Sequence, residues 1–161
     1  MSLLIGFIIG SSFVKTPPKS SAAKDELIKV KRVIDGDTIE IETGQKVRYI
    51  GIDTPELHNP KKPVGCFGQE AMEKNKQLVE GKIIRLEKDV SNTDKYGRLL
   101  RYVYLDDKTA SIEALFVNLI LVREGYATSS TFPPDVKYAT VFLEAQTSAR
   151  ENKMGLWEKC Q

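Results

Sequence analysis

The spacing of apolar residues divides the chain into segments typical of strands and segments typical of helices. Apolar and polar positions alternate over 26–42, and the turn-favouring stretch DGD separates two predicted strands there. After the turn TGQK, residues 47–52 form a third β-favouring run. Strand-like runs return at 82–89 and 97–107. The pattern therefore predicts five strands, and the first three form a meander.

Helical spacing predicts three helices, over 69–79, 112–124 and 136–152. Gly81 and Gly125 follow the first two and are expected to end them. A helix between the third and fourth of five strands is the layout of the OB-fold, a barrel that commonly binds nucleic acids or sugars on one face. The sequence thus predicts an α+β protein, mainly a five-stranded OB-fold barrel with three α-helices.

The composition is that of an ordinary globular domain, except at the start of the chain. Of the 161 residues, 41% are hydrophobic and 29% charged, which suits one domain, assigned to residues 24–161. Residues 3–14 form an apolar run, whereas a membrane-spanning helix needs about 20 residues. With SSAA at 20–23, the run is typical of a secretory signal peptide, although no Lys or Arg precedes it.

Residues 1–23 are therefore predicted to be a signal peptide or a short membrane anchor with a linker, and an ordinary apolar terminus is the remaining alternative. The protein is expected to be secreted or extracytoplasmic, with membrane contact only through such an anchor. A monomer is the default for a domain of this size.

The net charge argues against nucleic-acid binding by bulk charge. The chain has 24 Lys and Arg against 22 Asp and Glu, and removing residues 1–23 would remove Lys15 and Lys19 but no acid, which makes the two signs equal. Bulk binding requires an excess of cations to neutralise many phosphates. Chemistry on phosphate is therefore expected to be local.

The cysteines leave two interpretations open. Cys66 and Cys160 lie far apart in the sequence, and His58 is the only histidine, which excludes a zinc site of the Cys/His type. In an exported protein the two cysteines are expected to form one disulfide, worth about 4 to 5 kcal/mol in the chain-entropy model. In a reducing compartment they would be free thiols.

Asp37 is the first candidate for chemistry. Alternation from Ile39 and Ile41 places Asp37 on the buried face, where an ionised carboxylate is costly unless it is paired or binds a metal. The alternative is that DGDT is only a hairpin turn, which Asp-Gly strongly favours.

The stretch RYIGIDTPE carries the second group of candidates. Arg48 lies in an apolar strand, and Asp53 and Glu56 lie at and beyond its end. Strict alternation would place Arg48 and Asp53 on opposite faces, so Gly51 is expected to form a bulge that re-aims the side chains. Taken alone, DTPE also fits a helix start with Thr54 as its N-cap.

The stretch TDKYGR is either a polar turn around Gly97 or a phosphate-binding segment. Lys95 offers a point charge, Tyr96 a ring for stacking, and Arg98 a planar fork that suits phosphate.

Together these weak signals indicate one reaction. Asp37 and Asp53 would form a hard oxygen site for Ca²⁺ or Mg²⁺, Arg48 and Arg98 would clamp a phosphate, and Glu56 would serve as an acid-base or water-orienting group. A metal site, a phosphate clamp and an acid-base group are what phosphodiester hydrolysis requires.

The stretches VIDGDTIEI, RYIGIDTPE, GQEA, TDKYGRLLRYVY and LVREGYA resemble the staphylococcal nuclease (thermonuclease) family over about residues 29–157. The resemblance implies that Asp37 and Asp53 bind one Ca²⁺ with help from the carbonyl of Thr54. It also implies that Arg48 and Arg98 hold the scissile phosphate and stabilise its transition-state charge.

By the same resemblance, Glu56 activates or orients the attacking water, and Lys95 and Tyr96 contact a terminal phosphate of the nucleotide. The implied activity is calcium-dependent endonucleolytic and exonucleolytic cleavage of DNA and RNA that leaves 3′-phosphate ends. The sequence departs from the family's base-packing tyrosines, where ATSSTFPPD offers Thr131, Phe132 and Pro133 instead.

The rival interpretation is a non-catalytic nuclease-like OB module that binds nucleic acid or protein. Such a module has no need for the complete set, yet Asp37, Arg48, Asp53, Glu56 and Arg98 are all present. A sugar or protein binder with chance carboxylates would not explain both arginines. The enzyme is therefore the favoured interpretation.

Overall fold

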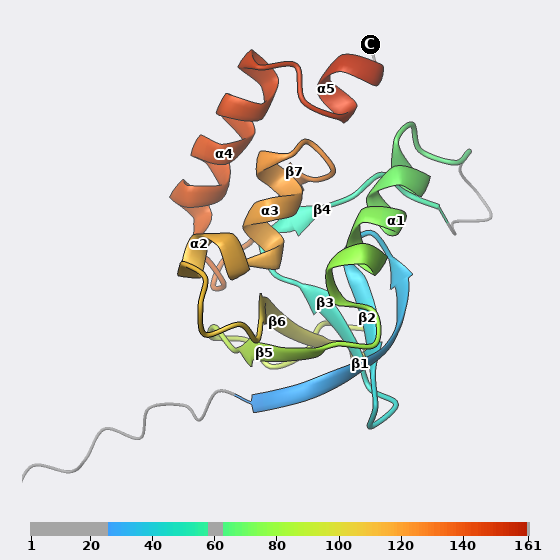
Figure 1. Ribbon diagram of the computed structural model, residues 1–161, viewed down its shortest axis with the longest axis vertical. Coiled ribbons are helices and arrows are strands. Elements are labelled where there is room, and N and C mark those ends of the chain that lie inside the picture. Colours follow the sequence, from blue (N-terminus) through green and yellow to red (C-terminus); the bar gives the residue numbers. More distant parts are fainter. Residues whose placement is uncertain (1–25, 58–62, 161) are drawn as a thin grey trace, which may run out of the picture.

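The structure is a computed structural model that describes residues 26–57 and 63–160. Figure 1 shows a β-barrel in the lower half of the molecule with the helices stacked above it. The barrel is closed in the order β1-β2-β3-β6-β5, and β3 and β6 are its one parallel pair among the described strands. These strands are β1 (Glu26–Asp35), β2 (Thr38–Ile41), β3 (Lys46–Tyr49), β5 (Ile83–Glu87) and β6 (Leu99–Leu105). The predicted five-stranded barrel is confirmed.

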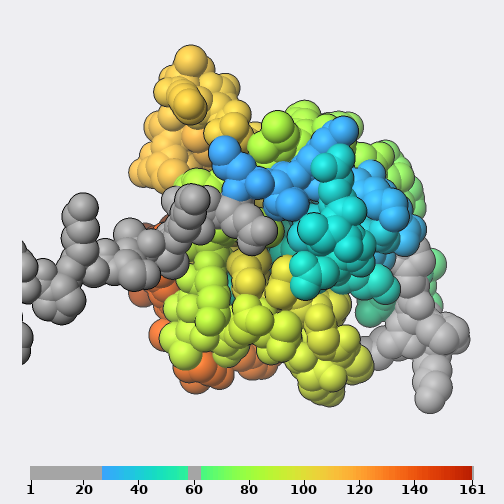
Figure 2. Space-filling view, turned by 90° about the horizontal axis from the view of Figure 1, so that it is seen from below, coloured from blue at the N-terminus to red at the C-terminus, as the bar shows by residue number. Residues whose placement is uncertain are grey.

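Figure 2 shows the barrel from below, with β1 and the β2–β3 hairpin in blue and cyan beside the green and yellow of β5 and β6. The helices are α1 (Gly68–Val79), α2 (Ile112–Leu115), α3 (Val117–Arg123), α4 (Ala139–Glu151) and α5 (Leu156–Lys159). Helix α1 lies between β4 (Ile52–Asp53) and β5 in the chain, as predicted, and α5 was not predicted.

The predicted helix over 112–124 is broken in two. Phe116 has ψ 95, so it cannot continue a helix, and its backbone forms a β-bridge with Tyr104 instead. Its ring is buried and stacks on that of Tyr104 at 4.5 Å between centroids. Burial of one aromatic ring outweighs local helix propensity here. The predicted helix over 136–152 begins only at Ala139.

The predicted strand over 47–52 is also interrupted. Strand β3 ends at Tyr49, and Gly51 has φ 79, a left-handed conformation that glycine adopts without strain. A Cβ at Gly51 would lie 2.5 Å from the Phe142 ring, so a side chain has no room there either. The chain resumes as β4 (Ile52–Asp53), which pairs with β7 (Thr128–Ser129) in a small second sheet.

A disulfide joins the loop before α1 to the end of α5. Cys66, just before α1, forms a disulfide with Cys160 at the end of α5, with the two Cα atoms 5.8 Å apart. The predicted signal peptide or anchor at 1–23 lies outside the described residues. Within the described ranges, no helix is both long and apolar enough to cross a membrane.

Candidate active site

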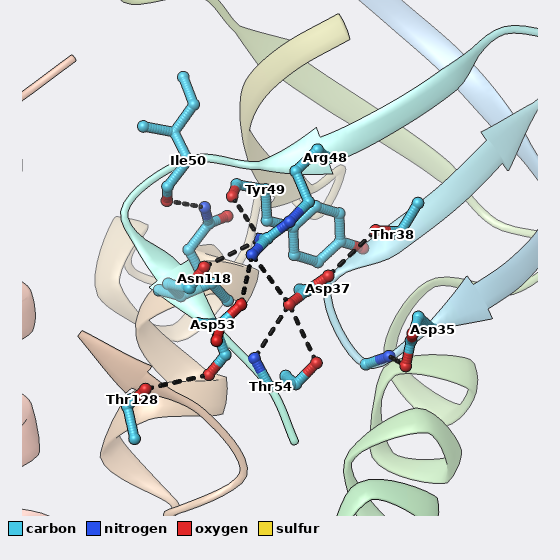
Figure 3. A network of polar contacts seen from close by, with 12 residues as sticks. Asp35, Asp37, Thr38, Arg48, Tyr49, Ile50, Asp53, Thr54, Asn118 and Thr128 are labelled. Atoms are coloured by element: carbon cyan, nitrogen blue, oxygen red, sulfur yellow. Dashed lines mark hydrogen bonds and ion pairs between the residues drawn. The ribbon is translucent and has the colours of Figure 1, made fainter. Parts of the chain in front are cut away.

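Arg48 lies at the centre of a polar network between the barrel and the small sheet (Figure 3). Its Nη2 contacts the carboxylates of Asp53 at 2.7 Å and Asp37 at 3.2 Å. Its Nη1 donates to the carbonyl oxygens of Tyr49 at 2.9 Å and Ile52 at 2.8 Å. Both terminal nitrogens are thus engaged, which fixes the plane of the guanidinium group.

Asp37 is buried, as the alternation predicted, with 6% of its surface exposed. One carboxylate oxygen accepts hydrogen bonds from the backbone N–H and the hydroxyl of Thr54, at 2.9 and 3.0 Å, and the other accepts from the Thr38 hydroxyl. Gly36 allows this approach, because a Cβ there would lie 2.7 Å from the Thr54 hydroxyl oxygen. DGDT is therefore a turn that also presents a carboxylate to the network.

The turn at Gly51 explains how Arg48 and Asp53 meet although strict alternation would separate them. Because the chain turns at Gly51, Asp53 points back toward the Arg48 guanidinium (Figure 3). The expectation that Gly51 re-aims the side chains thus agrees with the geometry, although the device is a turn between two strands rather than a bulge within one.

Two fully buried asparagines hold this turn, and the sequence analysis missed both. Asn118 of α3 donates to the carbonyl of Ile50 at 2.9 Å and accepts from the N–H of Val103. Asn75 of α1 accepts from the Tyr49 hydroxyl at 2.9 Å and donates to the carbonyl of Asp35. For Asn118 a signal was available in the sequence, because its amide lies within the apolar run VNLILV. An amide buried in such a run needs hydrogen-bond partners.

Arg98 is held by Asp94, a third residue that the sequence analysis missed. The Arg98 Nε lies 2.6 Å from one Asp94 oxygen, and the other accepts from the backbone N–H groups of Tyr96 and Arg98. Burial alone raises the pKa of Asp94, but these bonds outweigh it and hold the pKa below its ordinary value. The carboxylate therefore stays ionised and orients the guanidinium.

A cleft of about 270 Å³ brings the two arginines together. Arg48 lines it from β3, and Arg98 and Asp94 line it from the loop before β6. Phe132, 73% exposed, lies on its rim. Tyr96 is equally exposed, with the Lys95 Nζ 5.1 Å and the Arg98 guanidinium carbon 5.5 Å from its ring centre.

Among the described charged groups that shift the pKa of Asp53, carboxylates outnumber cations. The Asp53 side chain is 59% exposed, but partial burial of its carboxylate raises its pKa, Arg48 opposes the shift, and the charges of Asp37, Glu56 and Asp35 reinforce it. Glu56 is exposed just beyond Thr54. The raised pKa shows that this edge of the site disfavours further negative charge, a condition that a bound cation would relieve.

The donor chemistry fits a hard divalent cation with few protein ligands. Carboxylate oxygens of Asp37 and Asp53 and the backbone carbonyl of Thr54 are the oxygen type that Ca²⁺ and Mg²⁺ prefer. No three His, Cys, Asp or Glu side chains in the described ranges form a metal-binding group by themselves, so waters would complete the coordination. Cys66 and Cys160 lie on another side of Asp53, in a separate hollow.

Comparisons with known proteins agree with this arrangement. A family model described as "Staphylococcal nuclease homologue" matches residues 46–159. The protein named Thermonuclease from Staphylococcus intermedius is 38% identical over 143 residues, which cover 87% of this chain and 81% of that protein. Endonuclease YncB from Bacillus subtilis (strain 168) is 38% identical over 149 residues, covering 89% of this chain and 67% of its own length.

Thermonuclease from Staphylococcus hyicus is 37% identical over 140 residues, covering 85% of this chain and 79% of that protein. The family model covers the chain from β3 to α5, and each of these relatives matches more than four fifths of this chain. The barrel, helix α1 and the network of Arg48 with its carboxylates agree with these matches. The chain belongs to the staphylococcal nuclease family.

Proposed function

We propose that the protein is a calcium-dependent nuclease that hydrolyses phosphodiester bonds of DNA and RNA and leaves 3′-phosphate ends. The observation that carries the proposal is the cleft itself, in which Arg48 and Arg98 face one space beside a cluster with excess carboxylates. Its relatives bear the names thermonuclease and endonuclease. The calcium requirement and the product ends rest on the family resemblance.

Asp37, Asp53 and the carbonyl of Thr54 would hold the cation at the edge of the cleft. Bound there, Ca²⁺ would polarise a phosphate oxygen as a Lewis acid and offset the local excess of negative charge. The position beside Arg48 suits this role, because metal and guanidinium would then meet one phosphate.

Arg48 and Arg98 would hold the scissile phosphate from two sides. Each guanidinium is already oriented, Arg48 by two carbonyls and two carboxylates and Arg98 by Asp94. Donors fixed in advance need no reorganisation as charge develops on the phosphate oxygens, which is the basis of electrostatic transition-state stabilisation.

Glu56 would orient or deprotonate the attacking water, and its exposed carboxylate near Asp53 leaves room for that water. Lys95 and Tyr96 would contact a terminal phosphate from the neighbouring loop. Phe132 offers an exposed ring at the rim on which a base can stack without a hydrogen bond, because it lacks a hydroxyl.

The disulfide between Cys66 and Cys160 supports a secreted or extracytoplasmic location, where such bonds persist. A monomer would suffice for the activity, because every proposed site residue comes from one chain.

A direct test incubates the oxidised chain with single-stranded DNA, double-stranded DNA and RNA in Ca²⁺, beside Glu56→Gln, and analyses the ends of the products. The proposal predicts internal and terminal cleavage with 3′-phosphate ends, and Glu56→Gln should bind the same substrates while losing most of its turnover. Binding without cleavage in the wild type would favour the alternative, a non-catalytic nuclease-like OB module.

A further inference from the structure

The Cys66–Cys160 disulfide lies beside the segment that carries the carboxylates of the proposed site. A hollow of about 180 Å³ is lined on one side by Asp53, Thr54 and Pro55 and on the other by the two cysteines. Figure 1 shows α5 and the segment that precedes α1 at the same end of the molecule. The disulfide therefore lies next to the proposed site as well as at the end of α5.

The loop that contains Cys66 packs directly against the Asp53–Glu56 segment. The N–H of Gly65 donates to the carbonyl of Glu56 at 2.7 Å. A Cβ at Gly65 would lie 2.8 Å from the Pro55 Cβ and 2.9 Å from the Glu56 nitrogen, and one at Gly68 would lie 2.9 Å from the Pro55 carbonyl oxygen. The two backbones touch without space for a side chain, so movement of one displaces the other.

The other end of the disulfide is attached to the body of the protein. Leu156 of α5 donates its N–H to the Gly125 carbonyl at 2.9 Å, at the end of α3. Gly125 and Gly155 approach so closely that a Cβ on Gly125 would lie 2.2 Å from the Met154 oxygen. The disulfide thus joins the loop to a fixed support.

The described part of this loop, residues 63–67, has a strained backbone conformation next to the bond. Phe67 adopts φ 68, an unfavourable conformation for a residue with a side chain, and its ring stacks on Tyr126 at 5.4 Å. Cys66 is exposed to solvent. A reductant can therefore reach the bond, and the strained backbone next to it is able to relax once the bond opens.

We infer that Cys66 and Cys160 are positioning residues for the proposed reaction: their disulfide holds the loop that keeps Asp53, Thr54 and Glu56 in register with Arg48. The inference rests on the proposed nuclease function. A dithiol reductant transfers two electrons and two protons, the S–S bond becomes two thiols, and the dithiol becomes its own disulfide. Turnover would thereby be linked to an oxidising environment while the barrel stays folded.

The test compares oxidised protein, dithiol-reduced protein and the double variant Cys66→Ser/Cys160→Ser, with mass spectrometry to verify the redox state. In the reduced and double-variant forms we expect kcat on single-stranded DNA to fall about tenfold, because a small displacement of catalytic groups is enough for such a loss. KM should stay within about twofold, since the arginines that hold the phosphate are braced elsewhere. Reoxidation of the reduced protein should restore kcat.

Leu86→Ala is the matched control for lost stability. Leu86 is buried in β5, which pairs with β1 and β6 and with neither β3 nor β4 in the described sheets. At equal fractions folded, Leu86→Ala should keep the wild-type kcat. An unchanged kcat in the reduced protein and the double variant, or an equal loss in Leu86→Ala, would overturn the inference.

Hydrogen exchange separates this inference from the proposed function. Amide exchange at Thr54, Glu56 and Leu57 should accelerate on reduction while β2 and β6 keep their protection. If the oxidised protein cleaves no substrate, the proposed function fails, and the exchange comparison still decides the positioning role. Equal exchange at these three amides in both redox states would refute it.

Discussion

Strand β2 and the turn before it place two buried carboxylates three positions apart, in opposite electrostatic settings. Glu40 is 7% exposed, and its oxygens accept from Lys31 at 2.6 Å and from Arg32 at 2.6 and 2.8 Å. Hydrogen bonds from Lys31 and Arg32 hold the pKa of Glu40 below its ordinary value. Asp37 is equally buried and shares Arg48 with Asp53. The charges of Asp35 and Glu56 also act on Asp53.

The difference separates a structural ion cluster from a candidate active site. At Glu40 the cations outnumber the carboxylate, and nothing further is needed to neutralise it. At Asp37 and Asp53 the carboxylates outnumber the cation, and burial raises the pKa of Asp53 with the help of its acidic neighbours. Burial alone therefore does not distinguish a candidate functional carboxylate, whereas two carboxylates that share one arginine beside a cleft do.

The largest expected effect is a difference in cleavage rate between two arginine variants, one from each region. Arg98→Lys should lower the cleavage rate about a hundredfold or more, because an ammonium cannot replace a fork that is held by Asp94. The matched control is Arg32→Lys, which makes the same exchange at the Glu40 cluster and should keep the wild-type rate. Initial rates on single-stranded DNA measure both, and a near-normal rate in folded Arg98→Lys protein would contradict the clamp role.

The next effect concerns calcium and stability. A cation that binds only the folded protein should raise its free energy of unfolding by about 2.7 kcal/mol at a concentration one hundred times its Kd. Urea unfolding with and without Ca²⁺ measures this gain. We expect it in the wild type and in Glu40→Gln and expect its loss in Asp53→Asn. A gain that survives in Asp53→Asn would place the cation elsewhere.

A smaller effect is expected without metal. Glu40→Gln should lower the thermal midpoint, because Lys31 and Arg32 lose their charged partner. Asp53→Asn should leave the midpoint unchanged or raise it, because the fold already disfavours the ionised form of Asp53. Thermal unfolding near neutral pH in a chelator compares them, and a clear loss in Asp53→Asn would show that its pair with Arg48 is structural.

The smallest effect is a pH dependence of opposite sign in the two regions. Glu40 has a lowered folded-state pKa, so its contribution is present above its ordinary 4.5 and is lost as the pH falls through the lower folded value. Asp53 has a raised folded-state pKa, so its contribution is present below its ordinary 3.8 and is lost as the pH rises through the higher folded value.

Free energies of unfolding measured between acid and neutral pH should therefore show the gap between wild type and Glu40→Gln shrinking on acidification. The gap between wild type and Asp53→Asn should change in the opposite direction. Parallel curves for the two variants would mean that their charge environments do not differ.

Local pattern predicted much of this fold because its strands alternate and its turns have strong signals. The same alternation correctly placed Asp37 on a buried face, and one glycine, Gly51, indicated where the chain must re-aim Arg48 and Asp53. By the same alternation Glu40, between Ile39 and Ile41, would face away from the core, yet Glu40 is buried as well. Lys31 and Arg32 from the neighbouring strand cover it, and cross-strand partners do not follow from the pattern of one strand.

The remaining parts of the site depend on contacts between distant segments. Asn118 reaches Ile50 across 68 positions and Asn75 reaches Asp35 across 40, so their roles appear only when the helices are packed on the barrel. The helical segment is likewise interrupted at Phe116, whose buried ring stacks on that of Tyr104. In each case a tertiary contact outweighs what the local sequence favours.

The central claim is that the carboxylate-rich cluster holds a divalent cation that cleavage requires. The most direct measurement is the initial rate of single-stranded DNA cleavage by the oxidised chain as free Ca²⁺ is varied from chelator to saturation, with Asp37→Asn and Glu40→Gln in parallel. We predict no cleavage in chelator, a saturable rise with Ca²⁺ in the wild type and Glu40→Gln, and a severe loss in Asp37→Asn. Equal rates in chelator and in saturating Ca²⁺, or an Asp37→Asn variant as active as the wild type, would contradict the account.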